Sequence, residues 1–309
     1  MNELFDRDIL SGEQFTLDEI QTVMGVAHDM RRRVAHGTHL DNCHGKVLAS
    51  LFFEPSTRTR LSFETAMLRL GGQVIGFSSA ESTSVSKGET LSDTIQMADQ
   101  FANVIAMRHP RVGSAHEAAA VAVRPVINGG DGIGQHPTQA LLDLFTLQQE
   151  LGDFDGRTIA LVGDLRHGRT VHSAVEIYKH FNCRLILVSP EQLMLQRPMV
   201  ESLHKSGVAV TETTDLESAL SASDAVYMTR IQKERFADPS EYEKVKGCYV
   251  LNRELIMRTN SRIVVLHPLP RVDEISTDVD DLPGAAYFRQ AQNGVYVRMA
   301  LIAMVLGKA

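Results

Sequence analysis

Residues 54–60, with the sequence EPSTRTR, place hydroxyl and guanidinium groups at the point where an apolar run gives way to a helix. The run before them, residues 47–53, is typical of a buried strand, and Phe63 and Met67 then recur at helical spacing. A strand-to-helix turn leaves backbone N–H groups free at the positive end of the helix dipole. Arginine suits an anion at such a turn because its planar fork matches two oxygens of a phosphate or carboxylate. This stretch therefore predicts an anion-binding turn.

Similar side chains follow most of the other apolar runs that we interpret as strands. They are Ser84, Lys87, Arg108, His136, Gln139, Arg169, Arg230, Gln232 and the stretch HPLPR at residues 267–271. In open α/β sheets, ligands bind beyond the carboxyl ends of the strands, so these residues are candidates for a binding site.

The same strand ends lack the groups that other reaction types need. They present no pair of carboxylates, and the chain contains no nucleophile elbow, Cys–His motif, HExxH motif, dinucleotide fingerprint or P-loop. The predicted site therefore holds anions and donates hydrogen bonds.

Taken singly, the candidates also have ordinary structural interpretations: a helix cap for residues 56–59, a core histidine for His136, a solvated charge for Lys87 and a surface ion pair for Arg230.

Apolar runs alternate with helical patterns along the chain, which is typical of parallel sheets with helices on both faces. The expected strands lie near residues 46–53, 73–77, 103–107, 124–127, 157–163, 183–188, 208–212, 224–229 and 262–266. A first helix is signalled by the capping box Thr16-x-x-Glu19. The later helices are expected near residues 57–70, 89–101, 113–122, 137–151, 169–181, 197–206, 215–221, 252–259 and 286–306.

We therefore expect an α/β fold with two doubly wound parallel-sheet domains of similar size. The first would span residues 1–150 and the second residues 151–285, because the alternating rhythm restarts after residues 152–156. The C-terminal helix, within residues 286–309, would pack back on the first domain. It is too mixed to span a membrane because polar residues interrupt it, namely Arg289, Gln290, Gln292, Asn293 and Arg298.

Composition narrows the class of protein. The chain has 309 residues, 43% of them hydrophobic, and a net charge of −7, which disfavours a nucleic-acid binder. Cys43, Cys183 and Cys248 are far apart and odd in number, which argues against a disulfide framework and against a zinc site. We expect a protein of the reducing cytoplasm that binds neither nucleic acid nor a membrane.

Three motifs together resemble the carbamoyltransferase family. They are STRTR at residues 56–60, HPTQ at residues 136–139 and HPLP at residues 267–270, in the family's order and spacing across essentially the whole chain. The stretches 229–235 and 267–271 are similar to the aspartate-specific branch, whereas ornithine-specific members carry a cysteine where this chain has Pro268. The resemblance implies that carbamoyl phosphate and L-aspartate give N-carbamoyl-L-aspartate and phosphate, an early step of pyrimidine synthesis. It implies no cofactor and no metal.

The resemblance also implies a role for each candidate residue. Those implied to act on the reacting groups are Arg58, Thr59, Lys87, Arg108 and His136. Those implied to bind carbamoyl phosphate are Ser56, Thr57, Arg58, Thr59, Ser84, Lys87, Arg108, His136, Gln139, Pro268 and Leu269. Those implied to bind aspartate are Lys87, Arg169, Arg230, Gln232 and Leu269. Glu54 and Arg235 are implied to act in domain closure, Glu54 by pairing with Arg169 and Arg235.

A homotrimer is implied as well, because in the family the loop from Ser84 to Lys87 reaches into the neighbouring subunit's site. This chain has two residues between Ser84 and Lys87 where some relatives have three, so the role of Ser84 is less firmly implied. Regulatory chains could join such a trimer into a larger assembly. Two alternatives remain: a transferase for another acceptor such as ornithine, and a non-catalytic structural subunit, which would be expected to lose site residues that this chain keeps.

Overall fold

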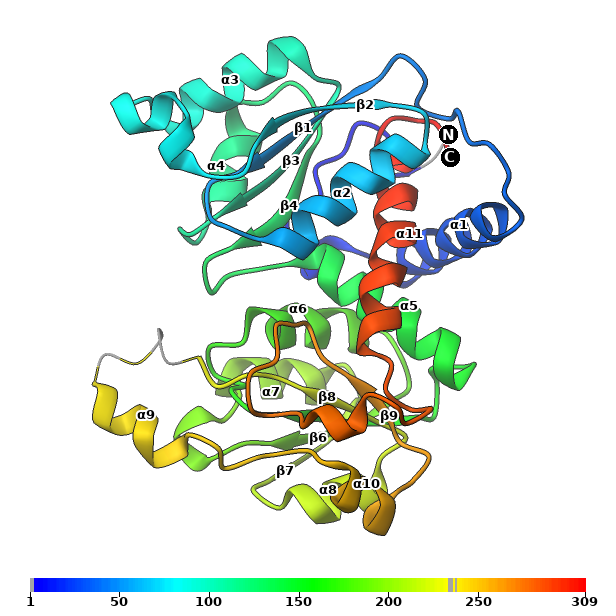
Figure 1. Cartoon of the computed structure of the whole chain (residues 1–309), viewed down its shortest axis with the longest axis vertical. Helices are drawn as coiled ribbons and strands as arrows, with labels where there is room; N and C mark the ends of the chain where they lie inside the picture. The colour runs from blue at the N-terminus through cyan, green and yellow to red at the C-terminus, as the bar shows by residue number, and fades with distance from the viewer. Residues whose placement is uncertain (1–2, 233–235, 237) are drawn as a thin grey trace. The chain divides into compact units, whose positions relative to one another are not determined.

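Two parallel sheets organise the chain, one in each of two units (Figure 1). This computed structural model describes residues 3–232, 236 and 238–309. The first unit comprises Met1–Leu142 and Ala291–Ala309, and the second comprises Asp143–Gln290. Each unit is an α/β structure with helices on both faces of its sheet, which confirms the expected fold class.

The sheet of the first unit has the strand order β2-β1-β3-β4, and all its pairs are parallel. Its strands are β1 (Val47–Phe52), β2 (Gln73–Phe77), β3 (Val104–His109) and β4 (Val126–Asp131). The two central strands, β1 and β3, are nearly continuous apolar runs because helices cover both of their faces. The edge strand β2 is largely exposed and carries a glycine and a glutamine.

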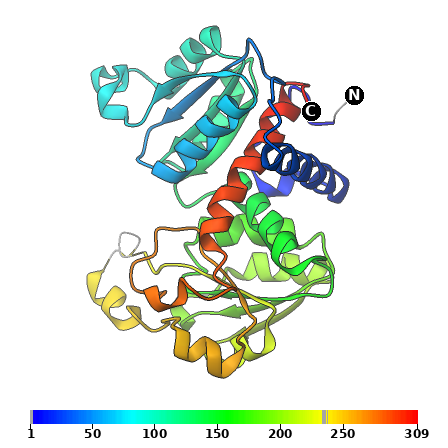
Figure 2. The same ribbon diagram turned by 45° about the vertical axis from the view of Figure 1, so that its right-hand side comes forward.

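Helices cover both faces of this first sheet. The helices of this unit are α1 (Leu17–Ala35), α2 (Thr57–Arg69), α3 (Leu91–Phe101) and α4 (Ser114–Val121), with parts of α5 (Pro137–Leu151) and α11 (Tyr287–Val305); its short 3₁₀ turns are η1 (Gly12–Gln14), η2 (Ala80–Ser82) and η3 (Ser84–Lys87). On one face, Ile95 of α3 and Ala118 of α4 pack against Ala49 and Ile105 of the central strands. On the other face lie α2 and the C-terminal part of α11 (Figure 2).

The C-terminal helix returns to the first unit, as the sequence predicts. Residues from Ala291 onward belong to this unit, and the backbone N–H of Asp6 donates to the carbonyl of Val305 at 3.0 Å. The predicted capping box also forms: Thr16 Oγ1 accepts from the N–H of Glu19, and Glu19 Oε2 accepts from the N–H of Thr16. In the described part of the chain, the helices are too short or too polar to cross a lipid bilayer.

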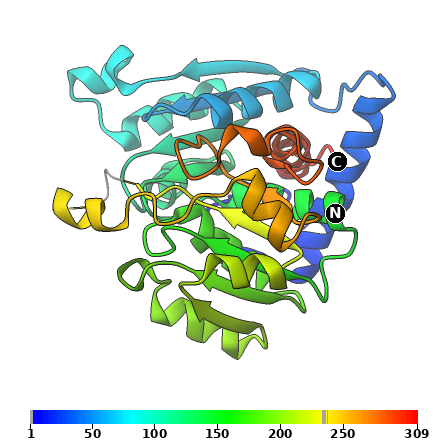
Figure 3. The same cartoon turned by 60° about the horizontal axis from the view of Figure 1, so that its bottom comes forward.

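The second unit has a five-stranded parallel sheet of order β7-β6-β5-β8-β9 (Figure 3). Its strands are β5 (Thr158–Val162), β6 (Arg184–Val188), β7 (Ala209–Thr213), β8 (Ala225–Met228) and β9 (Val264–Leu266). Its further helices are α6 (Arg169–Tyr178), α7 (Arg197–Lys205), α8 (Leu216–Ala222), α9 (Pro239–Val245) and α10 (Arg253–Thr259), with η4 (Glu191–Leu193) and η6 (Thr277–Val279). Leu220 of α8 and Ile256 of α10 pack against Val162, Val226 and Met228.

Two elements differ from the sequence-based expectation. Strand β4 continues through Asp131, where we expected a loop, because a buried glycine lets its backbone lie close to β3: a Cβ on Gly129 would stand 3.0 Å from the carbonyl oxygen of Met107. Helix α9 was not expected, since it lacks apolar periodicity. Its start is nevertheless marked by Asp238, whose side chain accepts from the N–H of Ser240 at 2.8 Å.

Gly163 fixes the spacing between the ends of β5 and β8. It has φ of +118°, and a Cβ there would stand 2.3 Å from the backbone oxygen of Thr229. Thr229 in turn donates its N–H to Val162 O at 2.8 Å and its hydroxyl to the same oxygen at 2.9 Å. Only glycine allows this approach.

We therefore predict that Gly163→Ala destabilises the protein by about 2–4 kcal/mol, the sum of the left-handed strain and the overpacking. The matched control is Gly152→Ala, which also has positive φ but open space around its Cβ position. The measurement is the midpoint of thermal and urea unfolding for both variants. Equal losses in the two variants would contradict the close approach to Thr229.

Candidate functional site

The carboxyl ends of three neighbouring strands in the first unit carry most of its predicted site residues. Phe52 at the end of β1 pairs with Arg108 of β3, and His109 of β3 pairs with Asp131 at the end of β4. The chain then runs from β1 into Glu54 and the STRTR turn, and from β4 into His136. Because parallel strands end at the same edge, the structure brings these segments together as the sequence predicts.

The first turn of α2 is formed by the STRTR residues. Ser56 is the N-cap of α2, but its side chain does not cap the helix, which disfavours the simple interpretation of this turn as a helix cap. Thr57 and Arg58 are exposed, whereas Thr59 is buried, with its methyl group near the backbone of Gly129 in β4. The backbone N–H groups at the start of α2 therefore accompany exposed hydroxyl and guanidinium groups, which is the arrangement that binds an anion.

Arg108 is held in place by a carboxylate and a backbone carbonyl. Its Nε donates to Glu54 Oε1 at 2.7 Å, and its Nη1 lies 3.4 Å from the carbonyl oxygen of Gly129. Both partners belong to the same sheet edge. The ion pair fixes the guanidinium plane and orients its remaining N–H groups.

The loop that leads to His136 is organised by buried side chains that the sequence analysis did not single out. Asp131 accepts from the N–H of Gln135 at 2.6 Å and from the N–H of Gly113 at 2.9 Å, and Asn128 accepts from the N–H of Gly130 at 2.8 Å. These bonds close a tight turn, so that His136 is buried immediately before α5. His136 Nδ1 lies 3.5 Å from the hydroxyl of Thr138.

Arg298 of α11 links the two helices that begin at this edge. It is 3% exposed and donates to Ser62 Oγ of α2 at 2.8 Å and to Thr138 Oγ1 of α5 at 3.2 Å. Its guanidinium carbon stands 4.9 Å from the ring centre of Phe63. In the sequence, Arg298 is visible only as one of the polar residues that interrupt an apolar helix, and such a cation is a signal for a buried polar partner.

The other predicted residues of the first unit lie at separate places. Ser84 and Lys87 are both exposed in the short turn η3, whose N-cap Thr83 accepts from the N–H of Val85. Gln139 is half-buried in the first turn of α5, where its N–H donates to the carbonyl of His136. Nothing among the contacts of Ser84 or Lys87 within this single chain assigns them a role.

In the second unit, the predicted residues again follow adjacent parallel strands. Arg169 opens α6 after β5, Arg230 follows β8, and the HPLPR stretch follows β9. The ends of these strands are in register, since Val162 pairs with Met228 and Tyr227 pairs with Leu266. Arg169, Arg230 and Gln232 are all half-buried. Arg235 lies outside the described residues.

The HPLPR stretch forms a buried turn built around the ring of His267. The N–H of Leu269 lies 2.8 Å from His267 Nδ1, and His267 Nε2 lies 2.6 Å from Glu274 Oε1. Because a backbone N–H can only donate, Nδ1 carries the lone pair and the ring proton sits on Nε2, pointing at Glu274. The contact allows Leu269 to keep its φ of +52°, a value that non-glycine residues seldom adopt.

Glu274 and Arg271 also stabilise this turn. Burial alone would raise the pKa of Glu274, but its hydrogen bond with His267 and backbone N–H groups outweigh burial and lower that pKa. Arg271 forms a bidentate ion pair with Asp280: Nη1 donates to Oδ1, and Nη2 donates to Oδ2 at 2.6 Å. The guanidinium of Arg271 lies over the ring of Tyr287. The hydrogen bonds to Asp280 raise the pKa of Arg271. Arg271 therefore braces the turn from within the second unit.

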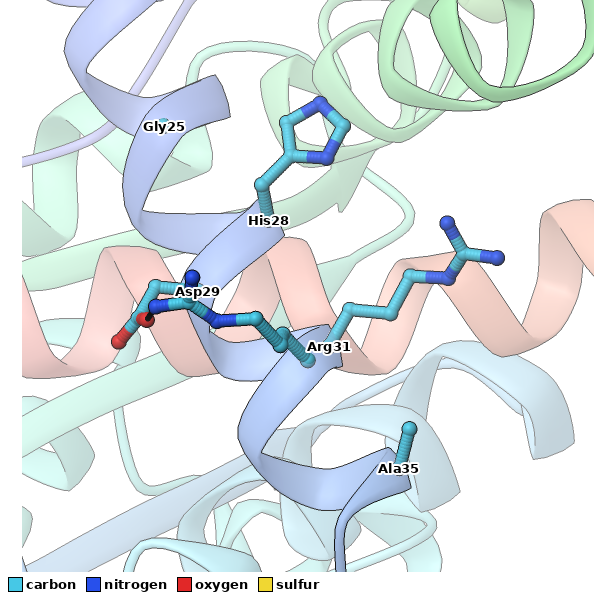
Figure 4. Close-up of a pocket in the computed structure, with 6 residues that line it drawn as sticks. Gly25, His28, Asp29, Arg31 and Ala35 are labelled. Carbon is cyan, nitrogen blue, oxygen red and sulfur yellow. Dashed lines mark hydrogen bonds and ion pairs between the residues drawn. The ribbon is translucent and has the colours of Figure 1, made fainter.

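A hollow on the surface of α1 shares no residue with these strand ends (Figure 4). It is lined by Gly25, His28, Asp29, Arg31, Arg32 and Ala35. Burial, and then the charge of Arg31, lowers the pKa of His28. Across all the described ranges, including this hollow, His, Cys, Asp and Glu side chains form no group of three that could hold a metal ion.

Both halves of the chain match known proteins. Residues 7–149 match the family model "Aspartate/ornithine carbamoyltransferase, carbamoyl-P binding domain", and residues 155–305 match the model of its "Asp/Orn binding domain". The chain is 53% identical over 301 residues to the aspartate carbamoyltransferase catalytic subunit of Thermococcus kodakarensis, covering 97% of each protein.

Two solved structures have the same fold over nearly the whole chain. One is aspartate transcarbamoylase from Trypanosoma cruzi in complex with carbamoyl phosphate and aspartate, with a TM-score of 0.94, 41% identity and coverage of 99% of this chain and 98% of that one. The other is the catalytic subunit of M. jannaschii aspartate transcarbamoylase, with a TM-score of 0.91, 46% identity and coverage of 97% and 98%. A family model matches each half of the chain, and a relative is 53% identical to it over 97% of both proteins. The chain therefore belongs to the aspartate/ornithine carbamoyltransferase family.

Proposed function

We propose that this protein transfers the carbamoyl group of carbamoyl phosphate to the amine of L-aspartate, giving N-carbamoyl-L-aspartate and phosphate for pyrimidine biosynthesis. One observation carries the proposal: in a chain of this family, the ends of β1, β3 and β4 and those of β5, β8 and β9 lead into arginine, histidine and hydroxyl side chains. The aspartate nitrogen attacks the carbonyl carbon and loses a proton, and the bond from that carbon to the phosphate oxygen breaks. Phosphate leaves with the electron pair of that bond.

A domain of residues 1–150, completed by the C-terminal helix 286–309, is proposed to bind carbamoyl phosphate; it includes the whole first unit, Met1–Leu142 and Ala291–Ala309. The residues Ser56, Thr57, Arg58 and Thr59 receive the phosphate at the first turn of α2, where amide N–H groups and the helix dipole stabilise the growing charge. Thr59, Arg108 and His136 donate to the carbonyl oxygen, and Gln139 accepts from the carbamoyl amine. The ion pair between Glu54 and Arg108 supports the second role because it orients the guanidinium.

A domain of residues 151–285, which lies within the second unit, Asp143–Gln290, is proposed to bind aspartate. Arg169, Arg230 and Gln232 grip the two carboxylates, while the backbone carbonyls of Pro268 and Leu269 accept from the carbamoyl amine and orient the attacking amine. Arginine pairs suit a dicarboxylate because each fork binds two oxygens. Domain closure is proposed to involve Glu54 with Arg169 and Arg235.

Two features of the sequence favour aspartate over ornithine as the acceptor of the carbamoyl group. Pro268 stands where ornithine-specific members have a cysteine, and Arg230 with Gln232 offers a clamp for a second carboxylate that ornithine lacks. A non-catalytic subunit of the same fold is the second possibility. The presence of Arg58, Lys87, Arg108, His136, Arg169 and Arg230 disfavours it.

The assembly is proposed to be a cytoplasmic homotrimer in which Ser84 and Lys87 complete the site of a neighbouring subunit. Both residues are exposed in η3, which leaves them available to another chain. Regulatory chains could extend such a trimer.

We expect the purified protein to form carbamoyl aspartate, and Arg58→Ala to lower kcat by about 10²-fold or more, the loss found when an oxyanion-type donor is removed. The measurement is carbamoyl aspartate production at saturating substrates, with Arg262→Ala, an exposed arginine far along the sequence, as the control. Product from ornithine but not from aspartate would refute the acceptor assignment.

Truncating the clamp should affect aspartate above all. Arg230→Ala is expected to cost about 2–5 kcal/mol of aspartate affinity, because it leaves a bound carboxylate without its partner. The apparent affinity for carbamoyl phosphate should change much less. Unaltered aspartate saturation in this variant would show that Arg230 is not part of the clamp.

Shared sites can be tested by mixing two inactive variants, Lys87→Ala and His136→Ala, after dissociation and reassociation. In a trimer with shared sites, each mixed assembly contains one site that takes His136 from one subunit and Lys87 from its neighbour. Activity should therefore reappear on mixing, and the native mass should be that of three chains. Mixtures that stay inactive although mixed trimers form would exclude the shared site.

A further inference from the structure

Gln290 connects a buried carboxylate to the turn that carries Pro268 and Leu269. Asp143 of α5 is fully buried, and Gln290 of α11 is 1% exposed. Gln290 Nε2 donates to Asp143 Oδ1 at 2.6 Å, and the backbone N–H of His267 donates to Gln290 Oε1 at 2.9 Å. Asp143 and Gln290 are also the first and last residues of the second unit.

The contacts of Gln290 with His267 and Asp143 determine which way its amide faces. A backbone N–H can only donate, so the amide oxygen faces the N–H of His267, and the amide nitrogen then donates to the carboxyl group of Asp143. The opposite orientation would set oxygen against oxygen at Asp143 and N–H against N–H at His267. Both contacts would be lost in a buried place, where unpaired polar groups are expensive.

The contact at His267 reaches the two carbonyls through two further bonds. Gln290 holds the backbone of His267, whose ring accepts from the N–H of Leu269 at 2.8 Å and donates to Glu274 at 2.6 Å. Leu269 has φ of +52°, so its backbone stays in place only while these neighbours hold it. The direction of the Pro268 and Leu269 carbonyls therefore depends on a chain of bonds that begins at Asp143.

We propose that Gln290 is a positioning residue for carbamoyl transfer: oriented by Asp143, it holds His267 and thereby aims the backbone carbonyls of Pro268 and Leu269. This proposal rests on the proposed function, in which those carbonyls accept from the carbamoyl amine and orient the attacking amine. Gln290 does not touch substrate itself.

The groups around this chain of bonds keep one charge state near neutral pH. Tyr178 of α6 and Tyr227 of β8 face Asp143; burial first, and then the charge of Asp143, raises the pKa of both phenols well above the ordinary value. Glu274, which faces His267, has a lowered pKa because its hydrogen bonds outweigh burial. The tyrosines thus stay neutral and Glu274 stays ionised across the pH range of an ordinary assay.

The first test is Gln290→Glu. The new carboxylate can still accept from His267, but it meets Asp143 with no hydrogen between the two groups. Two carboxylates at such a distance share one proton, so one of them acquires a raised pKa. The variant should work nearly normally below that pKa and lose about 10- to 100-fold in kcat as the pH rises through it, because misplaced groups slow a positioned reaction by that order.

The decisive variant exchanges the two groups, as Asp143→Asn together with Gln290→Glu. The new amide at position 143 can then donate to the new carboxylate at position 290, which still accepts from His267. Since the two contacts of position 290, with position 143 and with His267, each regain a donor and an acceptor, kcat and its pH profile should return to those of the wild type. The matched control is Gln292→Glu, on the same helix but exposed, which should leave kcat and its pH profile unchanged. A double variant as impaired as Gln290→Glu, or one that does not fold, would overturn the proposal.

A purely structural role predicts a different outcome. It would lower the thermal midpoint of Gln290→Glu but leave kcat of the folded protein at the wild-type value at every pH, and that result would also overturn the proposal. Hydrogen–deuterium exchange of residues 265–272, measured without substrate, should accelerate in Gln290→Glu at high pH and recover in the double variant. Since this readout needs no activity, a wild type that makes no carbamoyl aspartate would refute the proposed function while the exchange data still decide the role of Gln290.

Discussion

The common direction of the strands is the constraint on which the rest of this structure depends. In a parallel sheet every strand ends at the same edge, so side chains far apart in the sequence arrive there together. The first unit delivers the STRTR turn, Arg108 and His136 to one edge, and the second unit delivers Arg169, Arg230 and the HPLPR turn to another. The density of cationic and hydroxyl groups at these edges follows from topology. The STRTR turn adds a local cluster of such groups, at residues 56–60, to those that topology brings together.

Much of this could be predicted from the amino-acid sequence because the signals involved are local. Apolar runs such as residues 47–53 and 157–163 mark strands, and the helices that follow them begin and end close to the expected residues. The capping box joins Thr16 and Glu19, which are three residues apart in the sequence, so it could also be predicted from the sequence. Arg108, Arg169 and Arg230 were expected at strand ends, where the structure has them, whereas Ser84 and Lys87 lie apart in the turn η3.

What sequence patterns could not provide is the set of buried polar contacts between distant elements. Arg298 joins α2 and α5, and Gln290 joins α5 to the HPLPR turn, across separations that no periodicity encodes. Both residues were visible as polar interruptions of an apolar helix. Their partners became identifiable only once packing placed specific donors opposite specific acceptors. The extension of β4 through Asp131 was missed for a similar reason, since glycines there serve close backbone approach and not a turn.

The inward-facing arginine of the HPLPR stretch has a consequence for recognising relatives. Arg271 is engaged by Asp280 and by the ring of Tyr287, so its two-armed ion pair maintains the shape of the turn irrespective of any chemistry. A descendant that had lost catalysis would still be under pressure to keep this arginine in order to fold. Possession of HPLPR is thus a marker of architecture. Arg58 and Arg230 are the residues that we propose to bind the substrates, so under that proposal their retention is the better guide to whether a distant homologue is still an enzyme.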